Sequence, residues 1–358
     1  MKKFIKKFFK FLLILVLVIV LALAGLVGWL SAAEYRPEPV ETLSPLSDAA
    51  EQKLPQGAEL EILCWNIGYA GLGKDSDFIM DGGEHMRAAD KAAVENYLAG
   101  ISETVATGYD LVLLQEVDVN SARTYSIDES AVLASGDAFL ALNYSCPYVP
   151  NPNTYFIDPF GKINSGLLTC SGYAVERSER QSLPCPFSWP LRIVNLKRCL
   201  LVSYLPVEGS DKQLVLVNLH LEAYDDGEGK AAQTKQLMDF LEAEYQKGNY
   251  VIAGGDFNQV FPETLGIYPN THPENWIPGM LEYGSLPEGF SYAFDPAVPS
   301  CRLLNQPYDP SDTENTQYYV IDGLIVSPNV VVNAVETLDL SFADSDHNPI
   351  RLNVTLSD

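Results

Sequence analysis

One stretch of the sequence decides the fold: Tyr250-Val251-Ile252-Ala253-Gly254-Gly255-Asp256-Phe257-Asn258. A short apolar run that ends in glycines is typical of a buried strand followed by a turn. That turn presents Asp256 and Asn258 side by side, where the carboxylate can accept a proton from water or hold a hard cation. Glycine, aspartate and asparagine also form ordinary turns, so the rest of the chain must decide between the two interpretations.

Length and composition indicate one large globular domain with N-terminal additions. The chain has 358 residues, of which 47% are hydrophobic, and this is enough for a single extensive core. Its 25 glycines and 23 prolines predict many turns between short strands. We expect this globular domain at residues 58–358.

The N-terminus predicts a membrane anchor at residues 1–30. Five lysines precede an unbroken apolar run from Phe11 to Leu30, which as a helix spans about 30 Å, the thickness of a bilayer core. The lysines favour a cytoplasmic N-terminus and export of the domain. The small residues Ser31-Ala32-Ala33 leave a cleaved signal peptide as the alternative, in which case the domain is secreted. Residues 31–57, rich in proline, glutamate and serine, are predicted to form an extracytoplasmic stalk.

The charge of the exported part argues against general binding of polyanions. The first 30 residues hold five of the 23 basic residues and no acidic one, which leaves 18 against 47, a balance of −29. Proteins that bind nucleic acids neutralise phosphates with lysine and arginine, and no basic segment of that kind is visible.

The cysteines show no spacing typical of a metal site. Cys64, Cys170 and Cys199 lie in apolar runs and are interpreted as buried thiols. Cys146 and Cys185, each followed by proline, could pair in an oxidising compartment.

Strands and helices are predicted to alternate along the domain. A helix at 84–107 between strands at 59–66 and 110–117 is the α/β signature. Two long loops, Pro147–Phe160 and Phe261–Tyr319, are rich in tyrosine, proline and asparagine and are expected to border a site. The other predicted helices are 129–142 and 229–247, and the other predicted strands are 166–173, 174–181, 197–205, 213–221, 321–326, 330–340 and 349–356.

Polar residues occur at the ends of several of these apolar strands. Each has an ordinary explanation alone, as a cap, a solvated edge or a hydrogen-bonded core histidine. Strand ends at one edge of a layered fold converge on a shared crevice, however, so their joint occurrence predicts an active site. These residues are Asn66, Glu116, Asn218, His220, Asp256, Asn258, Asp322, Asp346 and His347.

The motifs around these residues resemble, in order, those of the endonuclease/exonuclease/phosphatase superfamily, which has the deoxyribonuclease I-like fold. The resemblance spans about residues 59–356. Gly323 departs from the bulkier residue that many members have after the aspartate, and the arginine-rich segments of the nuclease branches are missing. The motifs are Trp65-Asn66-Ile67, Gln115-Glu116-Val117, Ser165-Gly166-Leu167, Asn218-Leu219-His220, Gly255-Asp256-Phe257-Asn258, Ile321-Asp322-Gly323 and Ser345-Asp346-His347-Asn348-Pro349.

The resemblance implies an α/β (α+β) fold, a four-layer sandwich of two mixed β-sheets flanked by helices. It also implies hydrolysis of a phosphoester with bound Mg²⁺ or Mn²⁺. Glu116 would be the main metal ligand, with Asn66 and Asp346 beside it, and Asn218 would contact the substrate. Carboxylate and carboxamide oxygens independently suit such a hard cation.

The resemblance further implies catalytic roles. Asp256 would activate water, with Asn258 positioning it. His347, oriented by Asp322, would bind the phosphate, and His220 would do likewise or protonate the leaving oxygen. Whether Asp256 or the His347–Asp322 pair is the general base stays open.

We therefore expect a monomeric phosphodiesterase at the outer membrane face, anchored by its N-terminal helix. Its substrate is expected to be a small or lipid-linked phosphodiester. A surface-anchored nuclease is the main alternative, which the charge disfavours, and a non-catalytic binding domain on the same fold is the lesser one.

Overall fold

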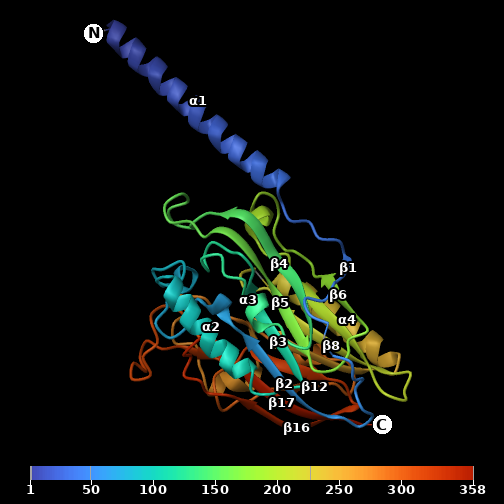
Figure 1. The fold of residues 1–358 in the computed structure, drawn as a ribbon. Helices are drawn as coiled ribbons and strands as arrows, with labels where there is room; N and C mark the ends of the chain where they lie inside the picture. The colour runs from blue at the N-terminus through green and yellow to red at the C-terminus, as the bar shows by residue number, and fades with distance from the viewer. Residues whose placement is uncertain (1, 49, 226, 358) are drawn as a thin grey trace.

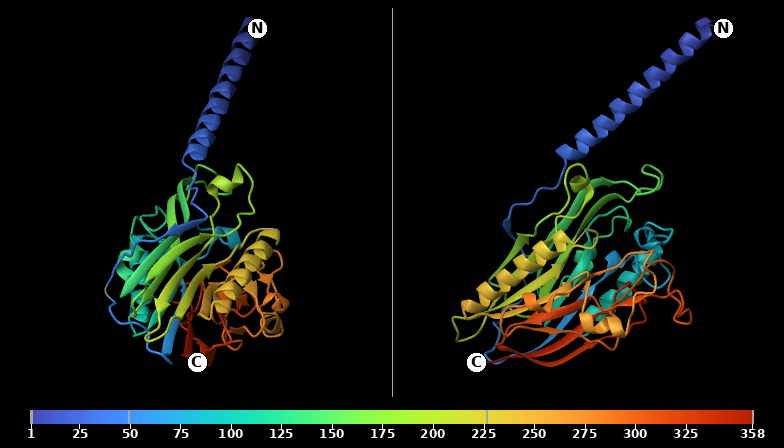
Figure 2. Two further views of the ribbon diagram at one scale, coloured as in Figure 1. Left: turned by 90° about the vertical axis from the view of Figure 1, so that its right-hand side faces the viewer. Right: turned by 180° about the vertical axis from the view of Figure 1, so that it is seen from behind.

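The computed structural model describes residues 2–48, 50–225 and 227–357. Two large β-sheets pack face to face, and helices α2 (Lys91–Val105) and α4 (Glu228–Gln246) cover opposite outer faces (Figures 1 and 2). The predicted four-layer sandwich of the α/β (α+β) class is confirmed.

The first sheet has seven strands, and the stretch Tyr250–Asp256 forms one of its inner strands. Strands β8 and β9 run parallel and are joined through α4, while the other pairs are antiparallel. In sheet order the strands are β1 (Val40–Thr42), β6 (Arg177–Ser182), β7 (Cys199–Pro206), β8 (Gln213–His220), β9 (Tyr250–Asp256), β15 (Asp322–Val326) and β12 (Ser291–Ala293).

The second sheet has six strands and repeats this arrangement. Strands β2 and β3 run parallel and are joined through α2, and the other pairs are antiparallel. The short helix α3 (Glu129–Leu133) follows β3. In sheet order the strands are β16 (Val330–Thr337), β17 (Ile350–Leu356), β2 (Glu59–Asn66), β3 (Leu111–Asp118), β5 (Gly161–Ser171) and β4 (Asp137–Val149).

Shorter elements lie in the connecting segments. The loop predicted at 261–319 contains four short strands, β11 to β14, and two 3₁₀ turns. β10 (Gln259–Val260) pairs with β11 (Gly279–Met280), and β13 (Cys301–Arg302) pairs with β14 (Tyr318–Tyr319). The 3₁₀ turns are η1 (Gly68–Ala70), η2 (Ile79–Asp81), η3 (Leu191–Val194), η4 (Pro262–Gly266) and η5 (Tyr283–Ser285).

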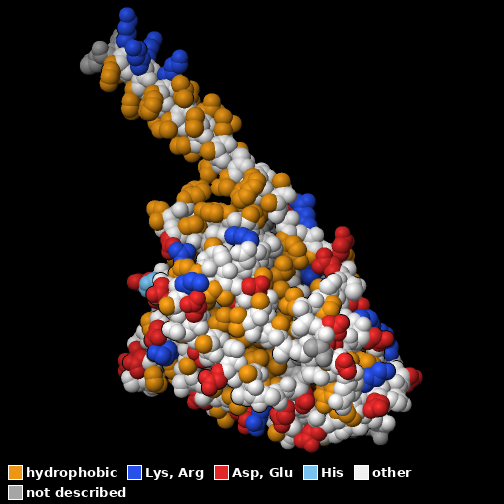
Figure 3. All heavy atoms as spheres, in the orientation of Figure 1, with side chains coloured by type: hydrophobic (Ala, Val, Ile, Leu, Met, Phe, Trp, Pro, Cys, Tyr) orange, Lys and Arg blue, Asp and Glu red, His pale blue; other side chains and the backbone are white. Residues whose placement is uncertain are grey.

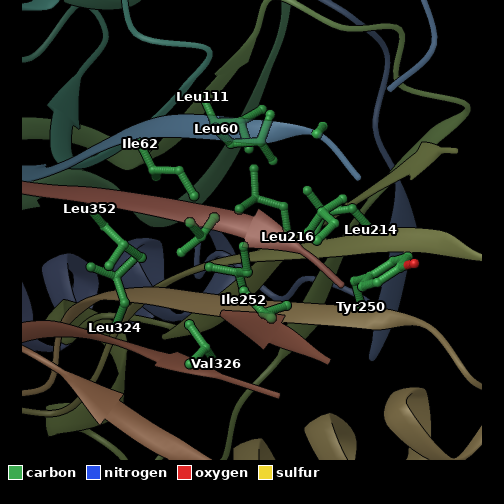
Figure 4. Packing of buried hydrophobic residues seen from close by; sticks show 14 of the residues in the cluster. Leu60, Ile62, Leu111, Leu214, Leu216, Tyr250, Ile252, Leu324, Val326 and Leu352 are labelled. Atoms are coloured by element: carbon green, nitrogen blue, oxygen red, sulfur yellow. The ribbon is translucent and has the colours of Figure 1, made fainter. Parts of the chain in front are cut away.

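The core between the sheets follows from alternation along the strands. Leu60 and Ile62 of β2 point from one sheet toward Leu214 and Leu216 of β8 in the other, and all four are fully buried (Figure 4). Each such side chain contributes roughly 1.5–3 kcal/mol by leaving water. This packing holds the two sheets in register, so that the strand ends at one edge stay close together.

Two predicted helices differ from the structure. The helix expected at 84–107 begins only at Lys91, because the Asp90 side chain caps it by accepting a hydrogen bond from the Ala93 amide at 2.9 Å. The helix expected at 129–142 is wrong beyond Leu133. Gly136 has a φ of +57°, which breaks the helix, and the following residues pair with β5 as strand β4. Strand pairing thus overrides local helical preference, and it also shortens the loop expected at 147–160.

The N-terminal helix α1 (Lys2–Ala32) extends away from the domain (Figure 1). It is long and apolar enough either to span a membrane or to be a signal sequence. The segment expected as a stalk packs against the domain instead: β1 pairs with β6, and Leu54 is fully buried in the core between the sheets. The apolar side chains of this segment explain the packing, because they gain by leaving water. All six cysteines are free thiols, so Cys146 and Cys185 do not pair.

Candidate active site

Three neighbouring strands of the seven-stranded sheet present three of the predicted residues in a row. His220 ends β8 and lies opposite Asp256, which ends the parallel strand β9. Asp256 in turn lies opposite Asp322, the first residue of the antiparallel strand β15. Strand register alone therefore brings these side chains to one edge of the sheet.

The six-stranded sheet supplies the facing residues. Asn66 ends β2, and Glu116 lies in β3 where the pairing with β5 shifts between Leu114 and Val117. Glu116 has a φ of 56°, so this irregularity of the strand redirects its side chain toward the site. Asp346 and His347 lie in the turn before β17, separated from it by Asn348 and Pro349.

A glycine allows the loop after β2 to approach Asp346 closely. Gly68 has a φ of +51°, and a Cβ added there would lie 2.7 Å from the Asp346 Oδ1 atom. Its amide donates a hydrogen bond to the Asn66 side-chain oxygen at 3.1 Å. Only glycine satisfies both the backbone angle and the space at this position.

The Asp256 carboxylate joins the residues of the two sheets. Its Oδ2 atom accepts a hydrogen bond from the Asn66 side-chain amide at 3.0 Å and lies 3.4 Å from His220 Nε2 and 3.9 Å from His347 Nε2. The Asn66 amide also donates to the Glu116 Oε1 atom at 3.2 Å. The two sheets thus meet in one hydrogen-bonded cluster.

His347 is held as a cation. Burial alone favours the neutral ring, but the Asp322 carboxylate, 2.8 Å from Nδ1, raises the net pKa of His347 well above its ordinary value. The Ser300 hydroxyl donates to the same Asp322 oxygen at 2.7 Å and fixes its position. The Nε2–H of His347 is therefore available as a hydrogen-bond donor to an anion.

The pKa values of Asp256 and His220 are shifted in opposite directions, so that each side chain suits acid–base chemistry near neutral pH. Burial, together with the Asp322 charge, raises the pKa of Asp256 to about 7. Burial, together with the charge of Arg198, lowers the pKa of His220 well below its ordinary value. Near neutral pH, a carboxylate able to accept a proton thus lies beside a neutral imidazole and a cationic one.

The two predicted asparagines of this sheet are placed differently. Asn258 lines the pocket; its backbone amide donates to Asp256 Oδ1 at 2.8 Å and its side chain to the Leu221 carbonyl at 2.9 Å. Asn218 lies deeper, where it donates to the Leu114 and Leu168 carbonyls, both at 3.0 Å. It therefore ties the two sheets together beneath the site.

The cluster forms one end of a cavity of about 490 Å³. Three charged residues that no motif marked also line it: Asp81 of η2, Arg123, and Arg198 before β7. Asp81 Oδ1 and Arg198 Nε are buried without a hydrogen-bond partner among the described residues. Burial, together with the Asp346 charge, raises the pKa of Asp81 to about 7. No motif marks these residues, because each reaches the site only through tertiary packing.

The donor atoms fit a hard divalent cation. Glu116 and Asp346 offer carboxylates and Asn66 offers a carboxamide. Burial, together with the nearby Glu116 charge, raises the pKa of Asp346 to about 6. A bound cation would offset this repulsion between the two carboxylates. The fold also brings Cys301 close to Asp346 and His347, a cluster that sequence spacing did not predict. Burial raises the pKa of the Cys301 thiol to about 12, so it stays protonated and is a poor ligand. The oxygen-rich set suits Mg²⁺ or Mn²⁺ better than zinc.

Together, the fold and the site define a metal-dependent hydrolase that acts on phosphate ester bonds. The chain belongs to the endonuclease/exonuclease/phosphatase family, whose family model matches residues 63–347.

Solved structures share this fold at low sequence identity. An endonuclease/exonuclease/phosphatase from Beutenbergia cavernae superposes with a TM-score of 0.53 at 17% identity, over 84% of this chain and 72% of that one. The human Nocturnin catalytic domain with bound sulfate gives a TM-score of 0.49 at 17% identity, over 88% and 97% of the two chains. Truncated TDP2 from Caenorhabditis elegans gives 0.47 at 17% identity, over 84% and 99%. No curated protein sequence matches the chain.

Proposed function

We propose that the protein hydrolyses a phosphodiester carried by a lipid or a small molecule at the outer face of the membrane. The observation that carries this proposal is the composition of the active-site cavity. Asp256 and His347 lie at its polar end, while its walls include Tyr144, Phe160 and Ile163. Such a cavity can hold the phosphate at the strand ends and an apolar group beside it.

The proposed chemistry assigns a role to each side chain of the cluster. Asp256 accepts the proton of the attacking water, and the Asn258 amide keeps the carboxylate in place. His347, positioned by Asp322, donates a hydrogen bond to a phosphoryl oxygen, and the neutral His220 donates another. Asp256 is favoured over the His347–Asp322 pair as the base, because His347 is already protonated near neutral pH.

A cation held by Glu116, Asn66 and Asp346 would neutralise the charge of the phosphoryl oxygens. We further propose that this cation is Mg²⁺ or Mn²⁺ and that Asn218 acts by positioning β8 beneath the site.

Nucleic acid is disfavoured as a substrate by charge. The balance of residues 31–358 is −29, and Arg123, which lines the cavity, is already paired with Asp118 at 2.8 and 2.9 Å. A long polyanion would therefore meet net repulsion, whereas a single phosphodiester needs only the local site.

The decisive experiment compares catalytic efficiencies of the full-length protein. Substrates are phospholipids in vesicles, bis(4-nitrophenyl) phosphate, nucleotides and plasmid DNA, each with Mg²⁺ at two salt concentrations. The chelator-treated enzyme and His347→Ala serve as inactive controls. We expect phospholipid or small diester to be cleaved fastest. Faster cleavage of DNA, with a steep loss as salt rises, would identify a surface nuclease instead, and activity in excess chelator would contradict the metal dependence.

The orientation in the membrane has its own test. Protease added to intact cells should remove the domain and leave α1 behind, because the lysines of α1 favour the cytoplasm. Protection of the domain would reverse the proposed topology.

A further inference from the structure

The domain is fastened directly to the end of α1. The Trp189 indole donates a hydrogen bond to the Ser31 hydroxyl at 3.1 Å, and Arg192 pairs with Glu34 at 2.8 Å. The Tyr35 hydroxyl reaches the Leu142 carbonyl of β4 at 3.3 Å. These contacts begin one residue after the apolar run ends at Leu30, which is itself buried. No spacer therefore separates the domain from the segment that would cross the bilayer.

This attachment sets the depth of the nearby residues. The headgroup layer extends roughly 5–8 Å beyond each side of the hydrocarbon core. If the apolar run up to Leu30 fills that core, Ser31 lies in the headgroup layer, and so does the Trp189 ring bonded to it. Tryptophan is the side chain that this layer favours most, since its ring is apolar and its N–H polar.

Large apolar side chains are exposed on the same end of the domain. Trp189 and Leu191 of the loop that ends in η3 are 58% and 62% exposed. At the tip of the β4–β5 hairpin, Tyr155, Phe156 and Ile157 are 63%, 59% and 73% exposed. The hairpin tip lies at the same end of the domain as the end of α1 (Figures 1 and 2), and hydrophobic side chains gather there in Figure 3. An exposed apolar cluster of this size marks an interaction surface.

A basic cavity adjoins this apolar cluster through Arg192, the residue after Leu191. It has a volume of about 450 Å³ and is lined by Arg36, Arg192, Lys197 and Arg198, with Glu34 as its one acidic residue among those described. Four basic residues in one cavity are notable in a domain whose balance is −29. Positive charge next to exposed apolar residues is complementary to a bilayer that contains anionic lipids.

We propose that these residues form a membrane-docking surface, defined as Tyr155, Phe156, Ile157, Trp189 and Leu191 together with the basic cavity. Its partner is the outer leaflet of a bilayer with anionic phospholipids. The active-site cavity includes Tyr155 and Leu191 in its lining, so it opens at this surface. A lipid phosphate could then reach Asp256 while its acyl chains stay near the bilayer. The inference rests on the proposed function for the outward orientation and for α1 being retained.

The first test measures the depth of Trp189 without any turnover. The full-length Trp29→Phe variant, which removes the tryptophan of α1, is reconstituted in vesicles of phosphatidylcholine and phosphatidylglycerol brominated near the headgroup. We expect strong quenching of tryptophan emission, and loss of most of that quenching when Trp189→Phe is added. Equal quenching with and without Trp189 would overturn the proposal.

The second test uses a variant pair. Phe156→Ser/Ile157→Ser should lower the efficiency on vesicle phospholipid about tenfold, yet leave bis(4-nitrophenyl) phosphate cleavage unchanged. Val331→Ser on β16, 48% exposed at the far end of the domain, is the matched control and should change neither. Arg36→Gln, which removes an exposed charge of the basic cavity, should reduce the gain from phosphatidylglycerol.

The two failures can be told apart. If no phospholipid is cleaved but Trp189 is quenched, the result supports the docking surface and contradicts the proposed lipid substrate. Equal effects of the hairpin variant and the control on vesicle turnover would contradict docking through the hairpin.

Discussion

Two buried asparagines, Asn66 and Asn218, occupy comparable positions near the ends of inner strands yet have different surroundings. Asn218 uses its amide entirely on the core: it donates to two backbone carbonyls and accepts from Gln115 at 2.8 Å. Asn66 donates instead to Glu116 and Asp256, two carboxylates that line the cavity. Burial alone therefore does not distinguish a structural polar group from a functional one. The difference lies in whether its partners are backbone atoms of the core or ionisable groups facing the site.

The largest expected effect comes from substituting the ionisable residues that surround Asn66. Asp256→Asn should lower turnover at least about 10³-fold, because it removes the proposed proton acceptor. The melting temperature should stay unchanged or rise, because the substitution removes a carboxylate that is buried next to the negative charge of Asp322. His347→Ala should act similarly, and the double variant should lose far less than the product of the two. Turnover near that of the unmodified protein in either variant would refute the assigned roles.

Metal binding gives the next largest effect. Glu116→Gln should weaken Mg²⁺ affinity by at least about tenfold, because it removes a charged oxygen ligand. The measurement is the rise in melting temperature on adding Mg²⁺, which needs no substrate. Glu95→Gln, on the exposed face of α2, is the matched control and should keep the full rise. An equal rise in both variants would exclude Glu116 as a ligand.

Asn218→Ala tests the other asparagine. It should lower the free energy of unfolding by about 2–3 kcal/mol, because the carbonyls of Leu114 and Leu168 and the Gln115 amide lose a buried partner. Turnover per folded molecule should change little. A raised KM with an unchanged melt would instead support the substrate contact that the family resemblance implies.

The last expected effect is a pH dependence of stability. The folded-state pKa of Asp256 is raised to about 7, so between the ordinary pKa and pH 7 the native state binds more protons than the unfolded state. The free energy of unfolding should therefore fall as the pH rises through this range. Asp256→Asn should lack this part of the decline, and thermal melts of both proteins from pH 4 to 7 measure it. Parallel curves would show that burial does not raise this pKa.

Sequence reasoning found the residues that carry recognisable motifs and missed those that do not. Asp256 and His347 stand in distinctive patterns, and strand periodicity placed them at strand ends. Asp81 and Arg198 have no such pattern, because they lie in a loop and before a strand and meet the site only through packing. The helix expected at 129–142 is wrong beyond Leu133 for a related reason: its local helical preference is outweighed by pairing of β4 with β5, the next strand along the chain.

The sequence by itself determined the layered fold, the family and the chemistry at the strand ends, because periodicity and motifs are local properties of the chain. Only the tertiary structure decided which buried polar groups face the cavity and which hold the sheets together, as Asn66 and Asn218 show. It also decided that β1 and Leu54, from the segment before the domain, pack against it. These outcomes depend on contacts between segments distant in sequence, whose energies no local pattern encodes.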